Sequence, residues 1–315
     1  MRGVLRWLGY GAASLIALSC IGVVLTWAPD RSVESLKPRW AAPPSTFIAV
    51  EGMQVHVRDV GPRGDPMPIV LVHGTSASLH TWNGWVAALE GTRRVITMDL
   101  PAFGLTGPAA DGDYSAARYA RFVLALLDQL GVNQMVLAGN SLGGEVAWHA
   151  ALAAPRRVTR LILVDAGGFP IAATSVPIGF RIARLPVLGR AAEYVLPRAL
   201  VEASVRNVYG DPARVSAELV DRYFELNLRA GNRRALAARF AQISRDDPSG
   251  RLRMIAMPTL ILWGGRDRLL LPADGAKFAR AIPGSRLVMF DDLGHVPHEE
   301  DAARTVAEVR RFIAP

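Results

Sequence analysis

Cysteine is almost absent from this sequence, which limits the kinds of site the chain can form. Cys20 is the single cysteine among 315 residues. One cysteine can neither close a disulfide within the chain nor supply the paired thiolates of a cysteine-based zinc site. Because 50% of the residues are hydrophobic, we expect a fold held together by a sizeable apolar core.

Lysine is also scarce, so arginine carries almost all of the positive charge. Lys37 and Lys277 are the only lysines, and the formal net charge is +8. No dense basic run is interleaved with aromatic residues, and we therefore predict no nucleic-acid partner. The basic composition favours an ordinary solvated surface or one that lies near anionic lipid.

Charged side chains are missing from residues 7–29, directly after Arg2 and Arg6. This run is long enough for the roughly 20 helical residues that cross a bilayer core. A cleaved signal peptide is an alternative, but no small-x-small pattern precedes Pro29. A lipoprotein signal at Cys20 is another, but the apolar run continues well past it. We predict a single transmembrane helix within residues 1–29, with the rest of the chain outside the cytoplasm because a short basic N-terminus usually stays inside.

The remaining chain divides by its pattern of apolar runs. Residues 30–46 contain three prolines and no helical period, which indicates a linker. Apolar strand-like runs alternate with helical segments over residues 47–166 and again over residues 251–315, which predicts an α/β fold with a mostly parallel, doubly wound sheet. Between them, residues 167–250 lose the strand-like runs and contain helical segments, which predicts a helical lid inserted into the sheet domain.

A nucleophile motif stands at the middle of the first α/β segment. Residues 139–143 read Gly-Asn-Ser-Leu-Gly, after a short apolar run at 135–138 and before an Ala-rich helical stretch. A Gly-x-Ser-x-Gly sequence between a strand and a helix is typical of a tight turn that exposes the serine hydroxyl at a helix N-terminus. Ser141 is therefore the candidate nucleophile.

A serine nucleophile needs a base, and the base needs a group that orients it. Functional groups of parallel sheets follow the carboxyl ends of strands, and two such loops carry candidates. Asp267 follows the expected strand 259–263, and His295 follows the strand 286–290. Asp165 is the alternative acid because it also ends a strand, and His298 is the alternative base, although it stands at what looks like the start of a solvated helix.

The oxyanion of an acyl-transfer intermediate needs two backbone N–H donors. Leu142, directly after the nucleophile, is the first candidate. Thr75 is the second, with Ser76 as the alternative, because the stretch from residue 73 follows the expected strand at 68–72. We expect His73 to organise that loop, His80 to lie near the mouth of the site, and His56 to lie on a strand surface.

These motifs together resemble the α/β-hydrolase superfamily over residues 47–315. The resemblance rests on His-Gly-Thr at 73–75, Asp-Leu-Pro-Ala-Phe-Gly at 99–104, the Ser141 motif, Gly-Gly-Arg-Asp at 264–267 and Gly-His-Val-Pro-His-Glu at 294–299. It implies the α/β-hydrolase fold with a helical lid and a Ser141–Asp267–His295 triad. Neither a metal nor an organic cofactor is implied.

Within the superfamily, two groups of enzymes compete. Gly-Asn-Ser-x-Gly-Gly is similar to meta-cleavage-product hydrolases, which cleave carbon–carbon bonds and use a lid arginine, here Arg233 or Arg234. Those enzymes usually carry a tryptophan after the catalytic histidine, whereas this chain has Val296. The His-x-Pro-x-Glu ending resembles ordinary carboxylesterases. Epoxide hydrolases and haloalkane dehalogenases use an aspartate nucleophile, against which Ser141 argues.

The sequence therefore predicts a membrane-anchored serine hydrolase acting on a small hydrophobic carboxylic ester. A carbon–carbon hydrolase with the same triad is the first alternative. A hydrolase-fold binding protein without catalysis is the second.

Overall fold

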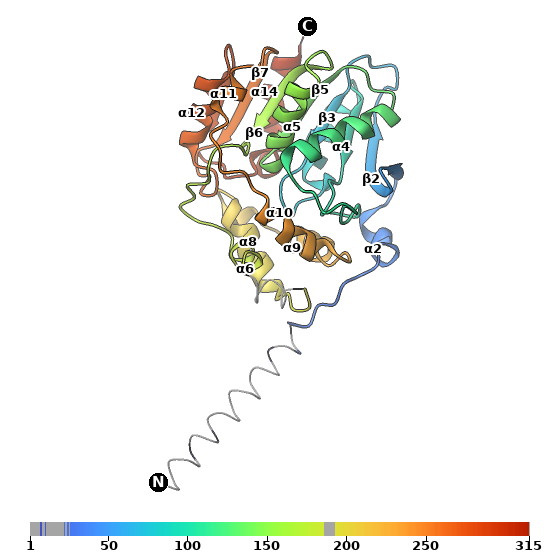
Figure 1. Cartoon of the computed structure of the whole chain (residues 1–315), viewed down its shortest axis with the longest axis vertical. Helices are drawn as coiled ribbons and strands as arrows, with labels where there is room; N and C mark the ends of the chain where they lie inside the picture. Colours follow the sequence, from blue (N-terminus) through green and yellow to red (C-terminus); the bar gives the residue numbers. More distant parts are fainter. Residues whose placement is uncertain are drawn as a thin grey trace.

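Eight strands form one twisted sheet in a computed structural model that describes residues 7, 10, 22, 24, 26–185 and 193–314. The order across the sheet is β1-β2-β4-β3-β5-β6-β7-β8 (Figure 1). Strands β3 to β8 pair in parallel, and β1 and β2 add an antiparallel edge. The strands are β1 (Ser45–Val50), β2 (Met53–Val60), β3 (Ile69–Val72), β4 (Val95–Met98), β5 (Met135–Asn140), β6 (Val158–Val164), β7 (Thr259–Gly264) and β8 (Arg286–Phe290).

The central strands are buried on both faces, which is why they are continuous apolar runs in the sequence. Successive side chains of a strand point to opposite faces, and β3 shows this directly. Ile69 and Leu71 belong to one core cluster, whereas Val70 and Val72 belong to the other. The two clusters form the two layers of core on either side of the sheet.

Helices cover both faces of the sheet. One face packs against α3 (Asn83–Leu89) and α14 (Ala302–Ile313), which contribute Trp85 and Val309 to the core. The other face packs against α4 (Ala116–Gln129), α5 (Leu142–Ala153) and α12 (Pro272–Ala281). Shorter helical turns complete this part, namely η1 (Leu79–Trp82), α11 (Ser249–Leu252) and α13 (Pro297–Glu300).

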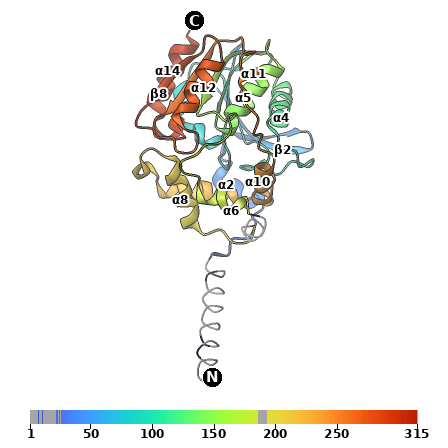
Figure 2. The same cartoon turned by 60° about the vertical axis from the view of Figure 1, so that its left-hand side comes forward.

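A group of helices is inserted between β6 and β7. It comprises α6 (Ile178–Ala183), α8 (Arg198–Val208), η2 (Pro212–Arg214), α9 (Ala217–Asn227) and α10 (Asn232–Ala241), and we call residues 178–241 the helical insertion. These helices lie together at one end of the sheet in both views (Figures 1 and 2). The inserted region was predicted to extend over residues 167–250, but α11 at 249–252 contacts α12 and lies with the sheet domain.

The linker predicted at residues 30–46 contains a helix, which its sequence pattern did not indicate. Helix α2 (Val33–Trp40) occupies the middle of it, capped by Ser32, whose hydroxyl accepts a hydrogen bond from Ser35 N–H at 3.2 Å. Leu36 and Trp40, one helical turn apart, are buried against Leu105 and Leu226. Tertiary packing of these two side chains therefore outweighs the poor helix propensity of the proline-containing sequence.

The transmembrane helix predicted within residues 1–29 falls mostly outside the described residues. Among the residues that the structure does describe, no helix is both long and apolar enough to cross a bilayer.

Candidate active site

Ser141 occupies a strained turn between β5 and α5. Its backbone has φ 54° and ψ −117°, a conformation that non-glycine residues rarely adopt. The turn is possible because its flanking residues lack side chains. A Cβ on Gly139 would lie 2.1 Å from the Gly143 carbonyl oxygen, and one on Gly143 would lie 2.1 Å from that of Val72. The close approach of strand and helix therefore explains why glycine stands at both positions.

His295 and Asp267 are joined by a buried hydrogen bond. His295 Nδ1 lies 2.7 Å from Asp267 Oδ2. The other carboxylate oxygen, Oδ1, accepts from Leu269 N–H at 2.8 Å and from Leu270 N–H at 3.0 Å. Because the carboxylate can only accept, Nδ1 of His295 carries the proton and Nε2 is left with a free lone pair. That tautomer is the one a general base requires.

Ser141 and His295 line the same cavity, so the structure brings the candidate nucleophile and base to one place. Asn140 ties their loops together: its side-chain amide donates to His295 O at 3.0 Å and to Val164 O at 3.1 Å. Sequence analysis assigned no role to Asn140. Its position before the nucleophile at the end of a buried strand was the available signal, since a buried amide needs partners from neighbouring loops.

The two candidate oxyanion donors flank Ser141. Leu142 is the first residue of α5, where a backbone N–H has no acceptor within its own helix. On the other side, a Cβ on Gly74 would lie 3.1 Å from Ser141 Cβ, so the loop that leads to Thr75 runs directly beside the nucleophile. Thr75 and Ser76 both line the cavity. The alternative between these two donors stays open.

His73 holds this loop in place. Its Nε2 accepts from Leu100 N–H at 3.0 Å, and its Nδ1 donates to Gly74 O at 2.7 Å. Full burial lowers the pKa of His73, which favours the neutral ring. A neutral ring is also required by the hydrogen bonds, because Nε2 can accept from Leu100 only when it carries no proton. The side chain therefore organises the loop, as the sequence analysis expected.

Three histidines lie elsewhere than expected. His56 is fully buried and bonds Asp99 Oδ2 through Nδ1 at 2.7 Å, instead of lying on a strand surface. His80 is buried against Trp40 O at 2.9 Å and does not line the cavity. His298 is fully buried too, with its ring centroid 4.1 Å from that of Trp82, so it does not begin a solvated helix. Burial lowers the pKa of His298 well below its usual value.

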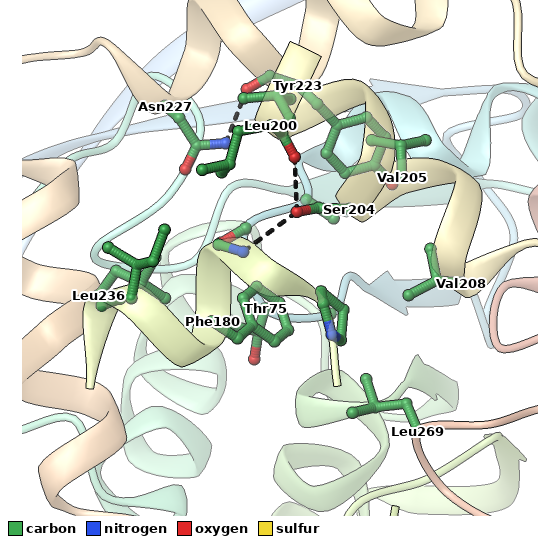
Figure 3. A pocket seen from close by; sticks show the side chains of 18 of the residues that line it. Thr75, Phe180, Leu200, Ser204, Val205, Val208, Tyr223, Asn227, Leu236 and Leu269 are labelled. Carbon is green, nitrogen blue, oxygen red and sulfur yellow. Dashed lines mark hydrogen bonds between the residues drawn. The ribbon is translucent and has the colours of Figure 1, made fainter. Parts of the chain in front are cut away.

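The cavity beside Ser141 measures about 350 Å³, and most of its wall is apolar. The helical insertion supplies much of this wall, as Figure 3 shows for Phe180 of α6, Leu200 and Val205 of α8, and Leu236 of α10. The hydroxyl of Ser204, also in the wall, is engaged by Gly179 N–H at 3.2 Å and by Leu200 O at 2.8 Å. The cavity therefore fits an apolar group next to the candidate nucleophile.

One of the two lid arginines considered from the sequence reaches this cavity. Arg233 lines it, is 7% exposed, and pairs with Asp30 at 2.7 Å. Arg234 is exposed and pairs with Glu193 at 2.8 Å. A cation in the wall could receive a carboxylate group of a substrate, and of these two arginines Arg233 is the one that lines the cavity.

Among the described residues, Asp165, Asp267 and His295 come near to the spacing of metal ligands, with one ligand atom from each within 4.8 Å of the others. Asp267 and His295 already share a hydrogen bond of 2.7 Å, and one oxygen of Asp165 accepts from Gly264 N–H at 2.9 Å. We therefore interpret the group as a hydrogen-bonded network of the candidate triad and not as a metal site.

Comparisons with known proteins agree with this fold. Residues 67–302 match a family model described as the alpha/beta hydrolase fold. A 2-hydroxymuconate semialdehyde hydrolase of Pseudomonas putida is 30% identical, with 85% of this chain and 93% of that protein covered. Among solved structures, a thermophilic esterase from Thermogutta terrifontis is 26% identical with a TM-score of 0.70, covering 85% of this chain and 96% of the other. A membrane phospholipase A, 23% identical with a TM-score of 0.72, covers 99% of this chain and 96% of the other. The chain belongs to the α/β-hydrolase family.

Proposed function

We propose that the chain is a serine hydrolase that cleaves a carboxylic ester with an apolar acyl or alcohol part. The observation that carries this proposal is that Ser141, in a strained turn, shares an apolar cavity with His295, whose Nδ1 is bonded to Asp267. This is the arrangement of side chains that activates a serine hydroxyl for acyl transfer.

The first half of the reaction forms an acyl-enzyme. His295 Nε2 takes the proton of the Ser141 hydroxyl as Oγ bonds to the ester carbonyl carbon. The carbonyl oxygen becomes an oxyanion, which the N–H groups of Leu142 and Thr75 stabilise. When the carbon–oxygen bond of the ester breaks, the leaving alkoxide takes the proton from His295, and the acyl group stays on Ser141.

The second half releases the acid. Water gives a proton to His295 and adds to the acyl carbon, and the bond to Ser141 Oγ then breaks as Oγ takes that proton back. Asp267 stabilises the imidazolium in both halves and holds its ring orientation. The helical insertion acts as the lid, because its helices form the outer wall of the cavity that would hold the apolar group.

A carbon–carbon hydrolase is the second candidate. Two observations favour it: Arg233 lies in the cavity wall, and the Pseudomonas putida relative carries the name of a semialdehyde hydrolase. Its substrate would place a carboxylate against Arg233 and use the same Ser141 and His295. The apolar lining, and Val296 where that group usually has tryptophan, make the ester the stronger proposal.

A substrate panel separates the two candidates. We expect purified full-length protein to hydrolyse p-nitrophenyl esters, with a kcat/KM that rises with acyl length until the 350 Å³ cavity is filled. Each buried methylene contributes about 0.8 kcal/mol, or roughly a fourfold gain. A vinylogous diketo dienoic acid is included in the same panel. Cleavage of this acid with a higher kcat/KM than any ester would replace the ester proposal by the second candidate.

Residues 7–29 are proposed to anchor this activity to a membrane, with the hydrolase domain on the non-cytoplasmic side. Where this uncharged run ends, Ala28 N–H donates to Tyr194 O at 2.9 Å, and the Trp27 and Tyr194 rings stack with centroids 5.9 Å apart. Both rings are about half exposed. Half-exposed aromatic side chains next to an apolar run are typical of a membrane interface.

Membrane fractionation tests the anchor. We expect the full-length protein to stay in the membrane pellet after an alkaline carbonate wash. Two central charges, Leu15→Arg with Leu18→Arg, should release it, because each arginine costs about 2.5–3.5 kcal/mol at the centre of a spanning helix. The exposed substitution Met254→Arg is the control, since Met254 lies in the hydrolase domain and is 71% exposed. Recovery of the unaltered protein in the carbonate supernatant would contradict the proposal.

A further inference from the structure

Asp165 is a buried carboxyl group that the mechanism above does not use. It directly follows β6, has φ 42°, and is fully buried. One oxygen, Oδ1, accepts from Gly264 N–H at 2.9 Å. The other, Oδ2, is buried without a hydrogen-bond partner among the described residues. A buried polar atom without a partner is costly, so its surroundings should explain it.

Two members of the candidate triad lie close to Asp165. One oxygen of Asp165, one of Asp267 and a ring nitrogen of His295 all lie within 4.8 Å of one another. Two ionised carboxylates in such a place would repel each other and could not form a hydrogen bond, because both would only accept. A single proton shared by the pair removes both difficulties.

The hydrogen bonds show which of the two carboxyl groups holds that proton. Asp267 receives three N–H donors, from Leu269, Leu270 and His295. Asp165 receives one, from Gly264. Hydrogen bonds to a carboxylate stabilise its charged form, so Asp267 is the anion and Asp165 is the acid.

We propose that Asp165 is a positioning residue whose carboxyl group carries a proton and donates a hydrogen bond to the Asp267 carboxylate. This bond gives Asp165 Oδ2 the partner it lacks and fixes the carboxylate that orients His295. The catalytic consequence rests on the serine hydrolase proposed above, whereas the location of the proton does not.

The surroundings of Asp165 keep it protonated at neutral pH. Burial raises its pKa well above the ordinary value, and the charges of Asp267 and Glu300 raise it further. Glu300, on α13, accepts backbone N–H groups from Gly210, Asp211 and Gly294. His295 faces the pair from the loop after β8. As the pH rises through this raised pKa, Asp165 loses its proton, the hydrogen bond is lost, and the two carboxylates repel each other.

Two substitutions distinguish a hydrogen-bond donor from a space-filling side chain. Asp165→Asn keeps a donor to Asp267 and cannot ionise, so its kcat near neutral pH should stay within about threefold of the unaltered enzyme, and its activity should extend to higher pH. Asp165→Leu has no donor, and its kcat should fall about ten- to a hundredfold with little change in KM, as expected for losing a hydrogen bond to a charged group. If Asp165→Asn lowered kcat as much as Asp165→Leu does, the proposal would be overturned.

Infrared spectroscopy of the folded full-length protein locates the proton without any activity measurement. The difference spectrum between the unaltered protein and Asp165→Asn at neutral pH should contain the carbonyl stretch of a protonated carboxylic acid, which should disappear at alkaline pH. Its absence at neutral pH would overturn the proposal even if Asp165→Leu does not fold. If this band is present but no ester is cleaved, the serine hydrolase proposal fails and the assignment of the proton stands.

Discussion

Ser141→Ala should abolish covalent labelling by a fluorophosphonate and lower kcat for a short chromogenic ester by about 10⁶-fold. The substitution removes the proposed nucleophilic oxygen, whereas the proposed oxyanion donors at Leu142 and Thr75 remain. A small residual rate above that of water is therefore expected from oxyanion binding alone. Alanine keeps a Cβ at the φ 54° position, so the backbone of the turn keeps its strain and the fold should persist.

Ser204→Ala is the matched control for this experiment. Ser204 lines the same cavity, but its hydroxyl is hydrogen-bonded to Gly179 N–H and Leu200 O (Figure 3). Its labelling should equal that of the unaltered protein. Persistent labelling of Ser141→Ala would assign the nucleophile to another residue. A folded protein that is not labelled at all would favour a hydrolase-fold binding protein over an enzyme.

The sheet and the order of the site residues could be predicted from the sequence because both depend on local signals. A strand buried on both faces is apolar at nearly every position, so β5 and β7 are visible as nearly continuous apolar runs. The loops after these strands must then lie at one edge of the sheet. Applied also to the loop after β8, that rule reduces the acidic residues and histidines of the chain to a few candidates, among them Asp267, His295 and the alternative acid Asp165.

The environment of single polar side chains could not be predicted, because it depends on partners far away in the sequence. His56 stands in a strand that forms the antiparallel edge, where a surface position is the ordinary expectation. It is buried because Asp99, from the loop after β4, bonds its ring. Helix α2 likewise depends on Leu105 and Leu226, which pack against Leu36 and Trp40. Which residues line the cavity depends on the directions of the helices in the helical insertion. These directions are determined by packing and cannot be inferred from the periodicity of apolar residues in the sequence.

Asp267→Asn should lower kcat by about 10⁴-fold with little effect on KM, because it places the imidazole proton on the wrong nitrogen. The hydrogen bonds around Asp267 determine how an asparagine would sit. Leu269 and Leu270 both donate N–H groups to Oδ1, so the amide oxygen must occupy that side. The amide nitrogen then faces His295 Nδ1 and donates to it. His295 would then carry its proton on Nε2 and could no longer accept the proton of Ser141.

The measurement compares kcat and KM for one short ester across Asp267→Asn, Asp165→Asn and Asp292→Asn. Asp292 is the control because it lies on the same loop as His295, is half-exposed, and forms an ion pair with Arg304. Such a surface pair contributes little, so Asp292→Asn should retain full activity. If Asp165→Asn lost more activity than Asp267→Asn, Asp165 would be the acid of the triad. The geometry favours Asp267, since its Oδ2 is the carboxylate oxygen that bonds His295 Nδ1 at 2.7 Å.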